Sequence, residues 1–369
     1  MTKLINYAMI SFLFFSFSSF KTERAQKQSH PLSVEAIRQM IVSDSSLDFQ
    51  PKATIITGPI RLNSTAAYIR TIDRKIDVSG IEYHLWRTAD GQEGKQTFLA
   101  GNKEMNFPHL FNIKDFSGKR GEYQIEAYGL FADGRKKLLA KSTLVFQQKV
   151  PILMYHSISF YRGKGIRELF VSPVNFERQM LYLKNNGYTL LTFERWDDIN
   201  KVNKPIFVTF DDGIKDNLNA LYILEKLKDG NFKPTATEFA IAGFIDSDSY
   251  RLTTADLKEM VNSGIFSIQS HTMTHADLPN ITNYDRELRA AKQKIEQITG
   301  EPVIAISYPY GGVNNKVVEE TRKQYKFAAT TKPGKYIQRG LPDELFLIRR
   351  VRINYTTNIN HFAELVACE

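Results

Sequence analysis

Cysteine is almost missing from this sequence. The chain of 369 residues contains one cysteine, Cys368. A single thiol excludes a disulfide framework and also excludes a metal cluster built from cysteine ligands. Any metal site must therefore use histidine and carboxylate side chains.

Nucleic-acid signals are missing as well. The formal net charge is +9, but the chain has no run of five or more basic residues and no nucleic-acid recognition motif, so no nucleic-acid partner is expected. An excess of positive charge instead suits long-range attraction to anionic cell-wall polymers or to a membrane surface. We therefore expect one of these surfaces as a partner.

The N-terminal segment 1–25 has no charged residue between Lys3 and Lys21. Its apolar core of about 17 residues is typical of a signal peptide, and it is also near the lower length limit for a membrane span. No A-x-A cleavage site follows, so a cleaved signal and a retained membrane anchor both stay open. Either one predicts export, and hence an extracellular, wall-associated or membrane-associated protein. Residues 26–50 are expected to form a linker.

Residues 51–148 show the alternation of apolar and polar side chains that is typical of strands. Asp90-Gly91 and Asp133-Gly134 lie between such runs, and Asp-Gly pairs in this position indicate hairpins. About seven short strands with regular turns predict a small all-β sandwich.

Residues 149–369 alternate strand and helix patterns, which predicts a parallel α/β architecture. Ser172 and Pro173 precede one predicted helix at its capping and first positions, and Thr253 precedes another with Asp256 at capping-box spacing. About eight strands are enough for a closed or nearly closed (β/α) barrel. In such barrels the active site forms where the strands end.

Four predicted strand ends bear chemically active side chains. Asp211 and Asp212 follow "PIFVTF", His271 and His275 follow "IFSIQS", His156 follows "PILMY", and Tyr310 lies in the "PYGG" turn after "VIAISY". Two imidazoles and one carboxylate are enough to bind Zn²⁺ or a similar divalent ion. If the strand continues through both aspartates, they point to opposite faces, so that one binds metal while the other acts on water. His156 is placed to act as a general acid.

The motifs "TFDDG", "SHTMTH" and "YPYGG" resemble the NodB-type polysaccharide deacetylases, carbohydrate esterase family four, over about residues 150–369. The resemblance implies a distorted (β/α) barrel of the NodB type and a divalent cofactor, zinc first, with cobalt or manganese as alternatives. It implies that Asp211 is the catalytic base and that Asp212, His271 and His275 are metal ligands. It also implies that Tyr310 donates its backbone N–H to the oxyanion.

The sequence departs from this family in three places. Ser307 stands where the family has an arginine that orients the catalytic aspartate, and Arg349 and Arg350 are the candidate substitutes. The family's Asp-Trp motif and its closing histidine motif are absent. "ILMYHSI" before the TFDD strand resembles the circularly permuted branch of PgaB and IcaB, which implies that His156 is the catalytic histidine. His361 is the alternative.

The segments "IEYHLWRTADGQ" and "GEYQIEAYG" resemble Bsp-like repeats, which implies a wall-associated accessory module. The implied reaction is metal-dependent removal of acetyl groups from GlcNAc residues of a cell-wall or extracellular polysaccharide. An amidase or esterase on the same fold, and a wall-binding protein with a degenerate barrel, stay open as alternatives. A glycosidase that uses Asp211 and Asp212 is disfavoured, because its two carboxyl groups must flank a sugar bond from positions about 5 Å or more apart.

Overall fold

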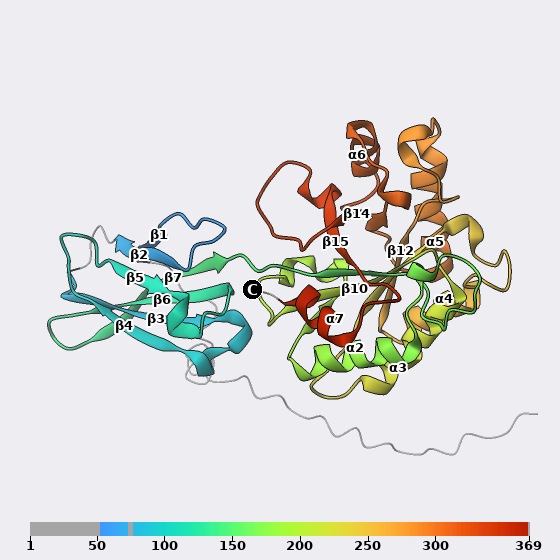
Figure 1. Ribbon diagram of the computed structural model, residues 1–369. Coiled ribbons are helices and arrows are strands. Elements are labelled where there is room, and N and C mark those ends of the chain that lie inside the picture. Colours follow the sequence, from blue (N-terminus) through green and yellow to red (C-terminus); the bar gives the residue numbers. More distant parts are fainter. Residues whose placement is uncertain (1–51, 73–76, 368–369) are drawn as a thin grey trace, which may run out of the picture. The chain divides into compact units, whose positions relative to one another are not determined.

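The computed structural model describes residues 52–72 and 77–367 (Figure 1). The predicted signal or anchor at 1–25 and the predicted linker at 26–50 lie outside the described residues. Across the described ranges, none of the helices has the length and apolar character that a membrane crossing requires.

The N-terminal strands form two antiparallel sheets. The first sheet has the order β1-β2-β5, and the second has the order β4-β3-β6-β7. Their strands are β1 (Thr54–Thr57), β2 (Ala66–Ile72), β3 (Gly80–Arg87), β4 (Gln96–Ala100), β5 (His109–Asn112), β6 (Gly121–Leu130) and β7 (Lys136–Phe146).

A shared apolar core joins these two sheets. Ile69 and Phe111 of the first sheet belong to the same buried cluster as Tyr83 and Ile125 of the second. Burial of these faces against each other gives the predicted sandwich. Both predicted hairpins form, since β3 pairs with β4 and β6 pairs with β7.

The C-terminal part is a parallel barrel surrounded by helices (Figure 1). Within the described residues, seven strands close a ring in the order β8-β10-β11-β12-β13-β14-β15, and β15 pairs back onto β8. Their bounds are β8 (Ile152–Tyr155), β10 (Pro205–Asp211), β11 (Ala236–Ala240), β12 (Phe266–Ser270), β13 (Ala305–Ser307), β14 (Phe327–Pro333) and β15 (Ile348–Arg352). An eighth strand, β9 (Thr189–Leu191), pairs with the first half of β10. The predicted barrel is confirmed.

Two helices begin where the sequence predicts. The Ser172 side chain accepts a hydrogen bond from the Asn175 N–H at the start of α2, and Thr253 forms a capping box with Asp256 at the start of α4. Such caps satisfy N–H groups that have no partner inside the helix. The helices are α2 (Pro173–Asn185), α3 (Leu218–Leu227), α4 (Thr254–Asn262), α5 (Ala291–Thr299), α6 (Asn315–Arg322) and α7 (Ile359–Val366).

The inner face of β10 changes from apolar to polar along the strand. The Phe207 ring packs 5.4 Å from the ring of Phe193, which also contacts Phe239 of β11 and Phe327 of β14. These strands are not all neighbours, so Phe193 fills the space between them. Two residues further along β10 is Thr209, and Asp211 then ends the strand. The aromatic cluster therefore lies behind the polar strand end and excludes water from that side.

Candidate metal and catalytic site

Asp211 and Asp212 separate at a turn. Strand β10 ends at Asp211, and Asp212 has a φ of 82°, a left-handed conformation that is uncommon for a residue with a side chain. Gly213 follows with a φ of 63°. The two carboxylates therefore diverge because the backbone turns after Asp211. The strand does not continue through both residues, so the turn takes the place of strand alternation in separating them.

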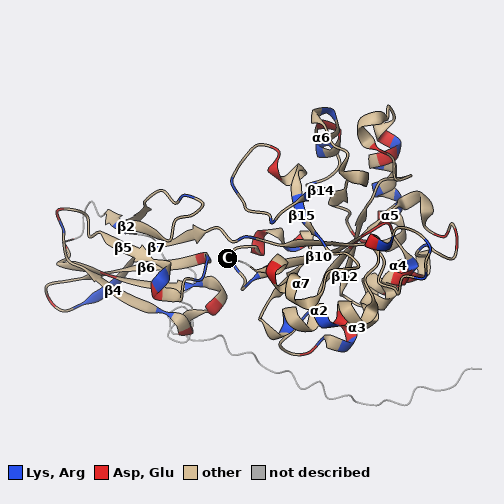
Figure 2. Ribbon diagram, in the orientation of Figure 1, with Lys and Arg blue, Asp and Glu red and all other residues tan. Residues whose placement is uncertain are grey.

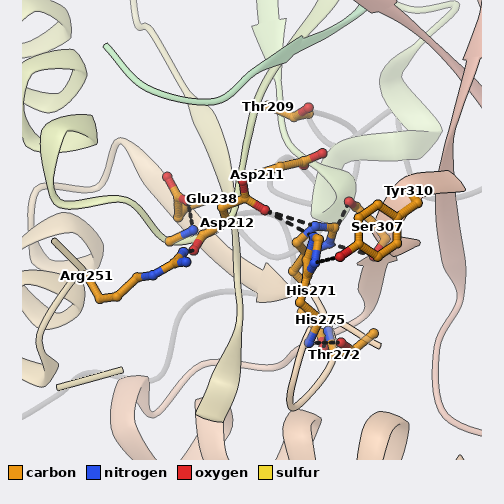
Figure 3. Close-up of polar contacts among 12 residues, drawn as sticks. Thr209, Asp211, Asp212, Glu238, Arg251, His271, Thr272, His275, Ser307 and Tyr310 are labelled. Carbon is orange, nitrogen blue, oxygen red and sulfur yellow. Dashed lines mark hydrogen bonds and ion pairs between the residues drawn. The ribbon is translucent and has the colours of Figure 1, made fainter. Parts of the chain in front are cut away.

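Asp212, His271 and His275 come together at the strand ends (Figure 3). The Oδ1 atom of Asp212 lies 3.4 Å from the Nε2 atom of each histidine. One ligand atom from each residue can be chosen so that all three lie within 4.8 Å of one another. A carboxylate oxygen and two imidazole nitrogens in this arrangement suit a divalent ion of the zinc type.

Hydrogen bonds behind the two imidazoles fix their orientation. The Nδ1 atom of His271 lies 2.8 Å from the Ser307 carbonyl oxygen, and that of His275 lies 3.0 Å from the Tyr310 hydroxyl. Because a carbonyl oxygen only accepts, Nδ1 of His271 bears the proton and the lone pair is on Nε2, which faces Asp212. Metal-binding histidines in proteins require this arrangement.

Glu287 holds the loop that positions both histidines. Its buried carboxylate accepts from the N–H groups of Met273 and Thr274 at 3.1 and 2.9 Å, and from the Thr274 hydroxyl at 2.8 Å. It belongs to a π-helical turn, Asp285–Ala290, which precedes α5. Sequence reasoning missed this residue, since one glutamate among the charges of a predicted helix gives no signal.

Arg350 binds Asp211 through two hydrogen bonds inside the barrel. Its Nη1 and Nη2 atoms lie 2.8 and 2.7 Å from the two carboxylate oxygens, and its Nε donates to the Thr330 carbonyl at 3.0 Å. Arg349 is exposed and donates to the Pro333 carbonyl instead. Of the two candidates, Arg350 is therefore the one that pairs with Asp211.

This pairing sets the charge of Asp211. Burial alone would raise the pKa of its carboxyl group, but the charge and hydrogen bonds of Arg350 act in the opposite direction, and the net pKa lies below the ordinary 3.8. Asp211 is therefore ionised at neutral pH. Each carboxylate oxygen has a second lone pair besides the one that Arg350 uses, so the group can still accept a proton.

Glu238 supports the Asp212–Gly213 turn from behind. Its fully buried carboxyl group accepts from the Gly213 N–H at 3.0 Å and from the Asn217 amide nitrogen at 2.9 Å. Burial, with smaller contributions from Asp211 and Asp212, raises its pKa well above the ordinary value. The sequence analysis did not select it, although a lone glutamate in the apolar strand β11 is an available signal.

His156 lies directly after β8 and is half-buried. Burial lowers the pKa of its imidazole, while the negative charges of Asp211 and Asp212 act in the opposite direction. The rival His361 is an exposed residue of α7. Of these two candidates for the catalytic histidine, His156 is therefore the one that interacts electrostatically with the two aspartates.

Tyr310 lies in the turn after β13 with a φ of 59° and a largely exposed side chain. Its ring packs against the ring of His275 at a centroid distance of 4.6 Å. The sequence analysis assigned a role to its backbone N–H and did not anticipate the contact of its hydroxyl with His275.

Several known proteins are similar to this chain in sequence and in fold. The family model "Polysaccharide deacetylase" matches residues 198–328. YxkH of Bacillus subtilis (strain 168), which bears the name of a polysaccharide deacetylase, is 33% identical over 215 residues, covering 56% of this chain and 72% of YxkH. Two crystal structures, from Bacillus anthracis and Bacillus cereus, have titles that name polysaccharide deacetylases. Each protein is 56% identical to this chain, and the TM-scores are 0.84 and 0.83 respectively. Each match covers 86% of this chain and 100% of the other chain. The chain therefore belongs to the polysaccharide deacetylase family.

Proposed function

We propose that this protein is a metal-dependent N-deacetylase that removes acetyl groups from GlcNAc residues of a cell-wall or extracellular polysaccharide. The observation behind the proposal is the convergence of Asp212, His271 and His275 at the rim where Asp211 is held by Arg350. Family membership supplies the general reaction, and these side chains supply the chemistry for hydrolysis of an amide.

Asp212, His271 and His275 would hold the metal. Their oxygen and two nitrogen donors favour zinc, with cobalt or manganese as alternatives. A divalent cation bound there supplies Lewis acidity, which polarises an amide carbonyl and makes nearby water more acidic.

Asp211 and His156 accept and donate the protons of the reaction. Asp211 accepts a proton from the attacking water, and its low pKa is sufficient because that water is already acidified. The oxygen of the water bonds to the carbonyl carbon, and the Tyr310 N–H stabilises the resulting negative charge. His156 donates a proton to the nitrogen as the carbon–nitrogen bond breaks, which yields acetate and a free amine. The proton that Asp211 has taken replaces the one that His156 gives, so the cycle balances.

The proposed domain bounds, location and partners come from the sequence patterns of the chain. We assign residues 1–25 to an export signal or membrane anchor, 26–50 to a linker, 51–148 to a Bsp-like accessory module and 149–369 to the deacetylase domain. Extracellular, wall-associated or membrane-associated placement follows, with anionic polymers or a membrane surface as partners. The position of β8 and His156 ahead of β10, with β15 closing the ring onto β8, supports the permuted PgaB/IcaB-like branch.

Two alternative functions differ from this proposal, one in the bond that is hydrolysed and the other in having no hydrolytic activity. An amidase or esterase would cleave a peptide or ester substrate with the same residues. A wall-binding protein with a degenerate barrel would release no acetate. Arg350 argues against degeneration, since it supplies the ion pair for Asp211 that Ser307 does not provide.

An acetate-release assay separates these possibilities. Zinc-loaded protein is incubated with GlcNAc oligomers, purified wall fractions, and peptide and ester substrates. We expect acetate from the acetamido sugars. His271→Ala should lose both metal and activity, whereas Asp211→Asn should keep the metal and lose activity, and His156→Ala should reduce turnover without metal loss. Acetate release at an unchanged rate after chelation would overturn the proposal.

A further inference from the structure

A groove of about 710 Å³ opens beside Asp212. Its size lies within the range of about 300–1,000 Å³ that is common for ligand sites. The segment that follows His156 supplies most of its lining, and Tyr250 and Arg251 line it as well. Because Asp212 lines its edge, a chain-like substrate with its reacting group at the metal ligands would extend into this groove.

The wall after His156 is a loop whose two ends are tied together. The Ser157 N–H donates to the Leu169 carbonyl at 3.0 Å, and the Val171 N–H donates to the Ser157 carbonyl at 2.9 Å. The Ser157 hydroxyl also donates to Asp216 at 3.0 Å, and Asn219 donates to the Ile158 carbonyl at 2.9 Å. We call residues 158–170 the groove loop. The hydrogen bonds at its base hold the backbone of the loop next to the site.

The groove has more positive than negative side chains. Arg162, Lys164 and Arg251 line it, against Asp212 and Asp216. Arg162 and Lys164 are exposed, and neither has an ion-pair partner in the described part of the chain. On the outer helices of the barrel, by contrast, Lys and Arg lie beside Asp and Glu (Figure 2). A metal bound at Asp212 would increase the positive potential of the groove further.

The guanidinium group of Arg251 already contacts residues of the protein. Its Nη1 donates to the Asp212 carbonyl oxygen at 2.5 Å (Figure 3), and its guanidinium lies over the rings of Phe244 and Tyr250. Among the described residues, Arg162 and Lys164 have no such partners, which leaves their charges available to a ligand.

Exposed aromatic rings accompany these charges. Phe160 on the groove loop is 56% exposed and Tyr250 is 48% exposed, and both line the groove. Ile166, which is 66% exposed, lines the same groove, so exposed apolar side chains gather there instead of standing singly. The flat apolar faces of the two rings suit the C–H faces of sugar rings, as the flanking cations suit carboxylate or phosphate groups.

We propose that this groove selects an acetamido-sugar polymer that bears anionic groups. The carboxylate or phosphate groups contact Arg162 and Lys164, and neighbouring sugar rings lie against Phe160 and Tyr250. This inference rests on the proposed function, because it assumes that the acetamido group to be hydrolysed lies at Asp212, His271 and His275.

Binding and turnover of three tetrasaccharides test the proposal. The probes are a neutral GlcNAc oligomer, an oligomer of alternating GlcNAc and N-acetylmuramic acid, which has lactyl carboxylates, and a GlcNAc oligomer with 6-phosphate groups. Calorimetry on metal-free full-length protein measures binding, and acetate release by zinc-loaded protein measures kcat/KM. The carboxylate and phosphate arms distinguish the two sources of negative charge.

We expect at least one anionic oligomer to bind about tenfold more tightly than the neutral one at low salt, since two exposed charge pairs each change affinity by roughly two- to fivefold. The preference should disappear at high salt and in Arg162→Gln/Lys164→Gln. The matched control Lys233→Gln/Lys258→Gln, which changes two exposed lysines that do not line the groove, should keep it.

Equal binding of neutral and anionic oligomers, or an unchanged preference in the groove variant, would overturn this inference. Failure of the proposed function looks different, because then no oligomer would lose acetate even if the binding preference is present.

Discussion

Arg350 and Asp211 form a two-point ion pair across the barrel, with both side chains almost fully buried. The pair fixes the carboxylate in one orientation at the strand end. Breaking a buried pair by removing one partner leaves an uncompensated charge, which costs about 3–5 kcal/mol. The ion pair therefore links the stability of the barrel to the geometry of the site.

Arg350→Met should lower the free energy of unfolding by about 3–5 kcal/mol because Asp211 loses its partner. Arg350→Lys keeps the charge but cannot form both hydrogen bonds, so we expect about a hundredfold loss of kcat with a smaller loss of stability. Denaturant unfolding and acetate release measure the two effects. Arg349→Lys, at an exposed neighbour, is the control. An Arg350→Lys enzyme as active as this control would contradict the assigned role.

Tyr310→Phe should weaken metal binding by about 10- to 100-fold, because the hydroxyl that orients His275 is lost. Isothermal titration with zinc measures the affinity. Tyr222→Phe, at an exposed tyrosine of α3, should bind zinc like the wild type. If both variants bind zinc equally well, the hydroxyl does not support the histidine.

Glu238→Leu should destabilise the fold by about 2–5 kcal/mol, since the buried donors of Gly213 and Asn217 each lose their acceptor. Glu238→Gln retains one acceptor oxygen and should cost less. Zinc affinity should follow the same order, because Gly213 adjoins Asp212. Metal titration is the decisive measurement: a loss of stability without any change in zinc affinity would limit Glu238 to a packing role.

Stability should depend on pH through Asp211. Its net pKa in the folded protein lies below the ordinary value, because Arg350 outweighs the effect of burial. The stabilisation is therefore present above the unfolded pKa of about 3.9 and is lost as pH falls through the folded pKa. A cation bound beside Asp211 would also lower the pKa of its carboxyl group. The stability advantage of wild type over Asp211→Asn should stay constant from pH about 7 to about 4 and shrink as the pH falls further, and an advantage that grows on acidification would refute this.

The sequence was sufficient to predict the barrel and the convergence of its strand ends. Alternating strand and helix patterns, followed by Asp212 after one strand and His271 and His275 after another, leave few other arrangements once parallel strands share one rim. The left-handed turn at Asp212 was not predicted, because aspartate adopts this conformation only in particular contexts.

The residues behind the site were harder to predict. Arg350 was left as one of two candidates, yet inward alternation from Ile348 along β15 would have favoured it over Arg349. Glu287 and the Tyr310 hydroxyl depend on how separate segments pack in three dimensions, and local sequence patterns do not encode such contacts.

The hydrogen bonds at the base of the groove loop make substitutions within the loop independent of the position of His156. The loop's fastening at Ser157, Leu169 and Val171 lets the residues between them mutate without moving the histidine that precedes them. Substitutions at the exposed positions 160 and 162–168 can therefore alter the lining of the groove while the strand ends keep their places.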